Sequence, residues 1–361
     1  MKKLTIIISL FFIFSFPSVL TAKTTTETKK NTSTVQTSSK KKSIKKIRAE
    51  IISVEKNFIR AEDDQKNRYS IDKNTKYTLA GSIHEGDEVI LKEIPTKNGK
   101  KYIINSFVRY DAIIVLFALF ILVLLLVNRK RGLKSILNLG VTYLVILFGI
   151  IPSILAGWPP ILVAVIGGMA AMTWNVYFTH GFNRKSHATI LGITSSLLIV
   201  GTLGWIFIKY ASLSGSVEEG ANILSSVGYE TINFRGLLLA AILIGALGVL
   251  DDLVISQVSV VQELKETNPD ISKTKLFTSA MKVGHDHTSA IVNTLVLAYT
   301  SASFPLVILF SIGSPPFTSL TSTLNNETVA TEIVRMLVGG IAILLSMPLA
   351  TIIATYLLTK E

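Results

Sequence analysis

The chain has 361 residues, of which 49% are hydrophobic and 17% are charged. So small a charged fraction, with a mean hydropathy of +0.51, excludes an ordinary soluble globular protein and predicts an integral membrane protein. The net charge of +12 does not favour nucleic-acid binding, because the lysines lie in an N-terminal tail and in short loops between apolar runs. The chain has no cysteine, which excludes disulfides, thiolate metal sites and cysteine nucleophiles.

The N-terminus starts with lysines, followed by an apolar segment. Residues 1–22, with a weak cleavage position at Ala22, are typical of a secretory signal peptide. An uncleaved anchor is the alternative, and its apolar run would be close to the shortest that spans a bilayer. In both cases we expect the following chain outside the cytoplasm. Residues 23–46 are almost all Thr, Ser, Lys, Asn and Gln, which predicts a flexible linker.

Short β-like runs occupy residues 47–110 and are separated by clusters of Asn, Gly, Asp and Lys. They predict a small extracytoplasmic domain of about five strands, with a barrel-like form as one option. An outer cap is the simplest role for it, and ligand sensing or partner binding are alternatives.

Residues 111–361 contain apolar runs long enough for helices across a hydrocarbon core of about 30 Å. The fold class is therefore mainly α, a polytopic transmembrane bundle. The expected helices are residues 112–128, 136–155, 160–178, 188–209, 236–261, 290–312 and 335–358.

Basic residues follow the first and the third expected helix, at 129–134 and 184–185. The positive-inside rule places both loops in the cytoplasm, and alternation then places the loop 212–234 outside. We therefore expect a multi-pass protein of the plasma membrane with an outer N-terminal domain and a cytoplasmic C-terminus.

Two successive helices carry acidic groups in or beside apolar sequence. Asp251 and Asp252 interrupt the run 236–261, and Asp286 precedes the run 290–312. Ionisable side chains at membrane depth are costly, which makes them functional candidates. The aspartate pair is predicted as a coupling-ion or proton site.

Polar side chains continue from these acids at helical spacing, since residues three or four apart share a face. One stripe consists of Asp252, Ser256, Ser259 and Glu263, and the other of Asp286, Ser289, Asn293 and Thr300. In antiparallel helices the stripes could face each other, through an Asp252–Asn293 contact or a water-filled seam. Asp251 points about 100° away towards apolar residues, which favours Asp252 as the principal site.

A structural role is the alternative for these polar residues. Serine and threonine hydroxyl groups in membrane helices often donate only to a backbone carbonyl of their own helix. The Asn293 side chain can form a hydrogen bond that holds two helices together. Small-residue pairs such as Ala241 and Gly245 likewise predict close helix packing rather than chemistry.

His285, Asp286 and His287 form a short cluster that suggests a metal site. Adjacent residues on a helix point in different directions, however, and helical metal ligands are usually spaced i, i+4. A histidine that is neutral, or that changes charge near the cytoplasmic interface, is the better interpretation. We expect no cofactor.

The connection between the two helices, residues 262–284, has an amphipathic pattern. Pro269 breaks the first helix, and Asp270 or Ser272 can cap the next. The pattern predicts a crossover helix at the cytoplasmic interface that ends at Gly284, with ordinary packing beneath the bundle as the alternative.

The sequence has no phosphate-binding loop, no HExxH and no G-x-S-x-G motif, so we predict no enzyme activity. A transporting chain without a nucleotide site must be a channel or use an ion gradient. The leading hypothesis is an ion-coupled secondary transporter or translocation protein for an unknown small solute or ion. It would work in the lipid bilayer, with membrane partner proteins or a homo-oligomer as further options. The alternative is a non-transporting membrane scaffold or envelope sensor that works through its outer β domain.

Several runs in the membrane part have a specific order. They are Gly248-Val249-Leu250-Asp251-Asp252-Leu253-Val254-Ile255-Ser256, Glu263-Leu264, Asn268-Pro269, Gly284-His285-Asp286-His287 and Asn293-Thr294-Leu295-Val296-Leu297-Ala298-Tyr299. In these runs the chain resembles the YibE/F family of bacterial multi-spanning membrane proteins. The resemblance implies a fold and topology more than an activity. Family members commonly have Gly-Arg-Asp in place of Gly284-His285-Asp286, and this departure removes a fixed cation that a salt bridge would need.

Overall fold

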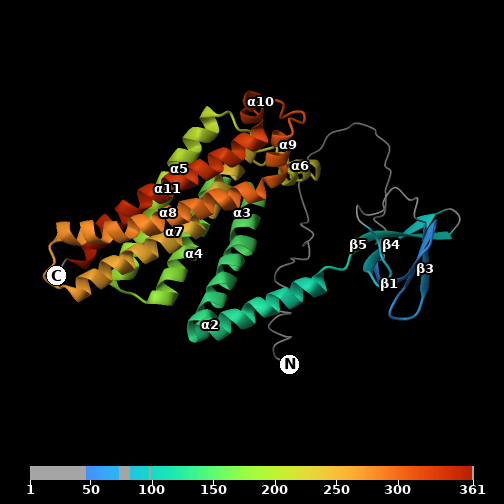
Figure 1. The fold of residues 1–361 in the computed structure, drawn as a ribbon, viewed down its shortest axis with the longest axis horizontal. Helices are drawn as coiled ribbons and strands as arrows, with labels where there is room; N and C mark the ends of the chain where they lie inside the picture. The colour runs from blue at the N-terminus through green and yellow to red at the C-terminus, as the bar shows by residue number, and fades with distance from the viewer. Residues whose placement is uncertain (1–45, 73–81, 97–98, 360–361) are drawn as a thin grey trace, which may run out of the picture. The chain divides into compact units, whose positions relative to one another are not determined.

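The structure is a computed structural model that describes residues 46–72, 82–96 and 99–359. The chain divides into two compact units, Met1–Arg129 and Lys130–Glu361, and each is described by itself (Figure 1). The predicted signal peptide or anchor and nearly all of the predicted linker lie outside the described residues.

The first unit contains a five-stranded antiparallel sheet in the order β3-β2-β1-β4-β5. Its strands are β1 (Lys46–Val54), β2 (Phe58–Glu62), β3 (Arg68–Asp72), β4 (Glu88–Thr96) and β5 (Gly99–Phe107). Because side chains alternate along a strand, one face of the sheet supplies a small apolar core. That core consists of Ala49, Ile51, Ile59, Ala61, Ile71, Val89, Leu91 and Ile104. The edge strands β3 and β5 approach each other, so the sheet curls towards closure. The predicted small β domain is therefore present.

Helix α2 (Tyr110–Leu144) begins in the first unit and ends in the second. Within the first unit, the Arg48 side chain donates to Asp111 at 2.7 Å and thereby links β1 to the start of α2. The helix is broken at Arg129, where φ is 46° and ψ is −122°. A residue with a side chain rarely adopts this conformation, so Arg129 interrupts the helical backbone.

The second unit is helical throughout (Figure 1). After α2 it contains the π-helical turn η1 (Val145–Ile150), α3 (Ile151–Leu155), α4 (Pro160–His180), α5 (Arg184–Tyr210), α6 (Glu219–Ser226), α7 (Phe234–Thr267), α8 (Lys273–Ala302), α9 (Phe304–Ser311), α10 (Leu320–Leu324) and α11 (Glu327–Leu358). Side-chain caps accept backbone N–H groups at the starts of α5, α7, α8 and α11. These caps are Asn183, Asn233, Ser272 and Asn326.

The described helices differ from the expected series in two places. Five helical segments are long and apolar enough to cross a membrane, or six if one bent pair counts as a span. The two expected helices before residue 156 count as one apolar run, Tyr110–Leu155, although the backbone break at Arg129 lies between them as expected. The expected helix 290–312 consists of α8 and α9, which are bent by 72° at Ser303.

The separate crossover helix near residues 262–284 was a wrong prediction. Its first residues belong to the end of α7, and its last belong to α8, which continues through Gly284 without a break. Helix α8 begins at the predicted cap Ser272, whose side chain accepts the Lys275 N–H. The sequence pattern changes from amphipathic to apolar at Gly284. The backbone nevertheless stays helical there, because a single glycine is tolerated in a helix.

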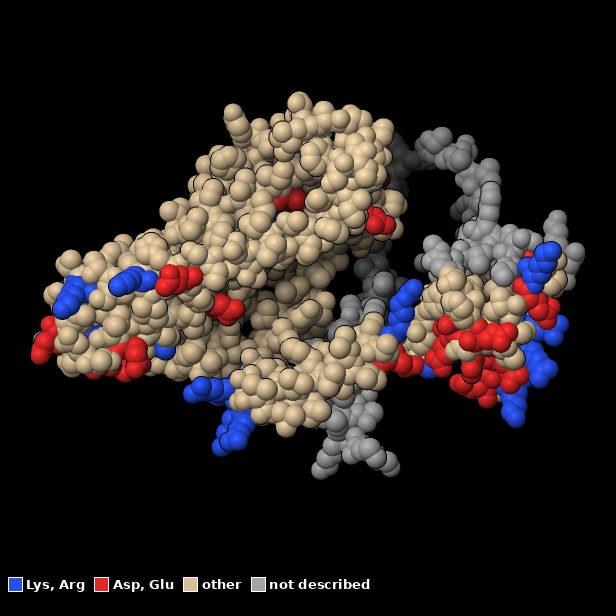
Figure 2. Space-filling model, viewed as in Figure 1, with Lys and Arg blue, Asp and Glu red and all other residues tan. Residues whose placement is uncertain are grey.

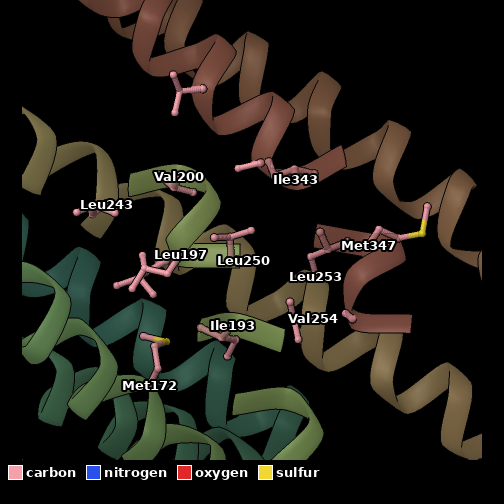
Figure 3. Packing of buried hydrophobic residues seen from close by; sticks show 14 of the residues in the cluster. Met172, Ile193, Leu197, Val200, Leu243, Leu250, Leu253, Val254, Ile343 and Met347 are labelled. Atoms are coloured by element: carbon pink, nitrogen blue, oxygen red, sulfur yellow. The ribbon is translucent and has the colours of Figure 1, made fainter. Parts of the chain in front are cut away.

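The core of the second unit lies between α4, α5, α7 and α11. Figure 3 shows residues of this core from four helices, namely Met172 of α4, Ile193 and Leu197 of α5, Leu250, Leu253 and Val254 of α7, and Ile343 and Met347 of α11. At Gly192 of α5, an added Cβ would lie 2.7 Å from a Val254 methyl group. The absence of a side chain there allows α5 and α7 to pack closely, which fixes the rotation of α7 in the bundle.

Candidate functional site

The rotation of α7 turns Asp251 into the bundle. Its side chain is 8% exposed and faces α4, where the Asn175 amide donates to Asp251 Oδ2 at 2.7 Å. The other carboxylate oxygen, Oδ1, is buried and has no hydrogen-bond partner among the described residues. Buried polar atoms are nearly always satisfied, so this oxygen has capacity for a proton, a water or a cation.

A line of polar side chains continues from Asp251 towards the ends of α4 and α2. Thr179, one turn after Asn175, has its hydroxyl 3.5 Å from Asn175 Oδ1. The Asn138 amide of α2 donates to the Thr179 hydroxyl at 2.8 Å. Asn175 lies five residues before the end of α4 at His180, or about 8 Å at 1.5 Å per residue. The line therefore connects the buried carboxyl with one end of the helical unit.

Asp252 has a different environment from its neighbour. Its side chain is exposed, while Asp251, Leu253 and Val254 are buried. Electrostatic interactions connect it with His287 of α8 and with Asp251. The sequence favoured Asp252 as the principal site because its face continues polar, whereas the structure gives Asp251 the buried position and the polar partner.

The second polar stripe lies on the surface of α8. Asp286, Ser289, Asn293 and Thr300 are all exposed there. Among the described residues no hydrogen bond joins Asp252 to Asn293, and the water-filled seam between the two stripes stays a prediction.

Three hydroxyl groups of the stripes bond to their own helix. Ser259 donates to the Ile255 carbonyl, Ser289 to that of His285, and Thr300 to that of Val296. For these three residues the structural alternative holds, since their hydroxyl groups are already occupied. Glu263 is exposed and Ser256 half-buried on α7.

Gln257 is a buried polar residue that the sequence analysis missed. Its amide donates to the Ala280 carbonyl at 3.0 Å and to the Thr351 hydroxyl at 2.8 Å, and so joins α7, α8 and α11. Asn138 and Asn175 were missed as well. Each is an amide in or beside an apolar run, and that pattern alone could have marked them as contacts between helices.

Gly284 lets α8 approach this junction. An added Cβ would lie 2.7 Å from Gln257 Oε1 and 2.9 Å from Met347 Sδ. The glycine in the Gly284-His285-Asp286-His287 run therefore serves helix packing. The described residues contain no group of three or more His, Asp or Glu side chains placed to hold a metal ion, and His285, Asp286 and His287 are all exposed.

The charged surface agrees with a bilayer environment for the helices. Within the helical unit, on the face shown in Figure 2, a group of Lys, Arg, Asp and Glu lies at the end where α7 joins α8, and a broad uncharged surface follows the helices. Large apolar side chains such as Leu198 and Leu297 are exposed on the helices. Such a distribution is typical of lipid-facing helices.

A model of the YibE/F-like protein family matches residues 116–360. The chain belongs to this family. The YibE/F-like region thus covers the whole helical unit and includes the Asp251–Asn175 pair. The comparisons with curated proteins and with solved structures gave no match. The family and the apolar helices together identify a membrane protein.

Replacing Gly284 by valine should separate α8 from Gln257 and Met347. We expect the overpacked junction to cost about 1–3 kcal/mol and to lower the melting temperature in detergent, followed by tryptophan fluorescence. Gly340→Val is the matched control, because a Cβ at Gly340 meets nothing within 4 Å. That variant should stay within about 0.5 kcal/mol of the wild type. Equal melting of the two variants would contradict close packing at Gly284.

Proposed function

We propose that this YibE/F-like protein is an ion-coupled secondary transporter or translocation protein, with Asp251 as its coupling-ion or proton site. The observation that carries the proposal is the buried Asp251 carboxyl with one oxygen paired to Asn175 and the other unpartnered among the described residues. A charged carboxylate in such a place is costly, and a bound proton or cation offsets that cost.

The line from Asp251 through Asn175, Thr179 and Asn138 supplies a route for the ion. These groups can both donate and accept hydrogen bonds, so they can hold the water molecules of a partly hydrated path for the ion. Asp252 supports the site from the neighbouring, exposed face of α7, near His287. Since no nucleotide-binding motif is present in the sequence, a gradient is the energy source that remains.

Purified protein in liposomes should show a proton- or sodium-linked flux that Asp251→Asn abolishes. The amide keeps the shape of the side chain but cannot exchange a proton or bind a cation as a carboxylate does. Asp270→Asn is the control, because Asp270 is exposed in the α7–α8 turn. If Asp251→Asn kept the full flux and its pH dependence, the proposed coupling role would be lost.

The proposed orientation in the plasma membrane puts the β domain and α6 outside and the α7–α8 turn in the cytoplasm. It rests on the basic residues 129–134 and 184–185 and on the positive-inside rule. Because the chain has no cysteine, single cysteines report the orientation directly. Ser226→Cys should react with a membrane-impermeant maleimide on intact cells, and Thr274→Cys only after permeabilisation. The opposite pattern would invert the topology.

The second candidate is a scaffold or envelope sensor that works through its β domain. It is favoured by a hollow of about 480 Å³ in the first unit. The charged residues that line the hollow are Glu50, Glu62, Asp63, Asp64, Glu85 and Glu88, together with Arg48 and Lys66. Hydrogen bonds from Asn67 and Tyr69 lower the pKa of Asp63 to about 2, so this group stays charged even in acid.

Deletion of residues 47–109 distinguishes the two candidates. A transporter should keep part of its ion-linked flux, because Asp251 and its partners all belong to the helical unit. A scaffold or sensor should lose its cellular function completely, even when the shortened protein is inserted at the wild-type level. Complete loss of flux from a correctly inserted deletion variant would favour the second candidate.

A further inference from the structure

A cavity of about 250 Å³ lies beside the bend between α8 and α9, and is called the bend cavity below. Its walls come from the end of α8 and from α9, α10 and α11, and they are mostly apolar, with Leu306, Phe310, Ile333 and Met336 among them. Sites for small molecules are typically concave and apolar, with a few polar groups that orient the ligand. The bend cavity has this character, and Asp251 and its partners do not line it.

The bend itself gives the cavity a polar end. The axes of α8 and α9 differ by 72°, and Pro305 has no N–H to donate to the Ser301 carbonyl as a continuous helix would require. The last carbonyl groups of a helix carry partial negative charge. Tyr299, Thr300 and Ser303 line the cavity, so it lies at the negative end of the 30-residue helix α8. Interrupted membrane helices present such ends to ions and substrates in transporters.

Glu332 of α11 adds a carboxylate to the same cavity, and it is the charged residue of the lining. Arg335, which lies outside the lining, donates to Glu332 at 3.1 Å and to Glu218 at 2.7 Å. One guanidinium therefore serves two carboxylates, and two negative charges with one positive charge leave a net charge of −1. The Glu332 carboxylate can accept a further hydrogen bond or ion pair from inside the cavity.

Charge and wall chemistry together define the class of ligand. The end of α8 and the Glu332 carboxylate both favour a positive group and disfavour an anion. A bare metal ion needs several oxygen ligands, whereas these walls are mostly apolar. The described residues also contain no group of three or more His, Asp or Glu placed to hold a metal. An organic cation meets both conditions, because its apolar body contacts the walls while its charged nitrogen reaches the carboxylate.

We propose that the bend cavity binds a small organic cation with an apolar body, an amine or a quaternary ammonium compound, and that its nitrogen lies at Glu332. As a substrate site the cavity deepens the transport function proposed above and rests on it. Binding of the cation does not depend on ion coupling, since it requires only the residues of the cavity.

Equilibrium dialysis of benzyltrimethylammonium against the purified full-length protein in lipid nanodiscs tests the ligand class, with empty nanodiscs as the blank. Neopentylbenzene is the matched probe, because it has the same shape with a carbon in place of the charged nitrogen. Wild type should bind the cation saturably and the neutral probe about tenfold more weakly or less, as expected for loss of one charged contact. Equal binding of the two probes, or no saturable binding of the cation, would overturn the proposal.

Removal of the Glu332 charge tests the position of the nitrogen. Glu332→Gln should weaken binding of the cation by about tenfold or more and leave the neutral probe unchanged. Glu219→Gln is the control, because it removes an exposed carboxylate next to Glu218 that does not line the cavity. Wild-type affinity in Glu332→Gln, or an equal loss in both variants, would contradict a specific role for Glu332.

A pair of tryptophan variants tests the cavity without changing any charge. Val307→Trp should fill it and abolish binding of the cation, whereas Ile308→Trp should not, because Val307 lines the cavity and Ile308 is exposed outside it. Equal binding by the two variants would place the ligand elsewhere. Binding is measured without an ion gradient. Binding without flux would therefore overturn ion coupling alone, and flux without binding would overturn this site alone.

Discussion

A carboxyl group inside an apolar helix bundle must be paired, neutralised or wetted, and this constraint organises the helical unit. Asp251 meets it in part, through the Asn175 amide at 2.7 Å, and leaves its second oxygen unpartnered among the described residues. The contact forms only if α4 and α7 keep their relative rotation. The apolar core between α4, α5, α7 and α11 therefore stabilises the fold and also keeps Asp251 and Asn175 within hydrogen-bonding distance.

Two glycines hold the helices in that rotation. Gly192 permits the approach of α5 to Val254, and Gly284 permits the approach of α8 to Gln257 and Met347. The Gln257 amide then joins α7, α8 and α11 through two hydrogen bonds. Helices in lipid associate through close packing and a few polar contacts, because apolar burial between them gains little.

The sequence assigned both aspartates to one site, but in the structure their side chains have different environments. Asp251 faces the line of amides and hydroxyl groups inside the bundle, and Asp252 lies on the exposed face of α7.

The sequence by itself determined the membrane class, the family, the cap of α8 and the existence of the β domain. These depend on composition, on long apolar runs and on local hydrogen bonds such as that of Ser272, all of which are contained in short segments. Only the tertiary structure decided which aspartate is buried. Neighbouring residues on a helix differ by about 100° in direction, and the partner of Asp251 lies 76 residues earlier in the chain. The polar stripe led to Asp252. In this bundle, however, the inner face of α7 packs against α4, α5, α8 and α11 and is mostly apolar, and the polar stripe remains outside.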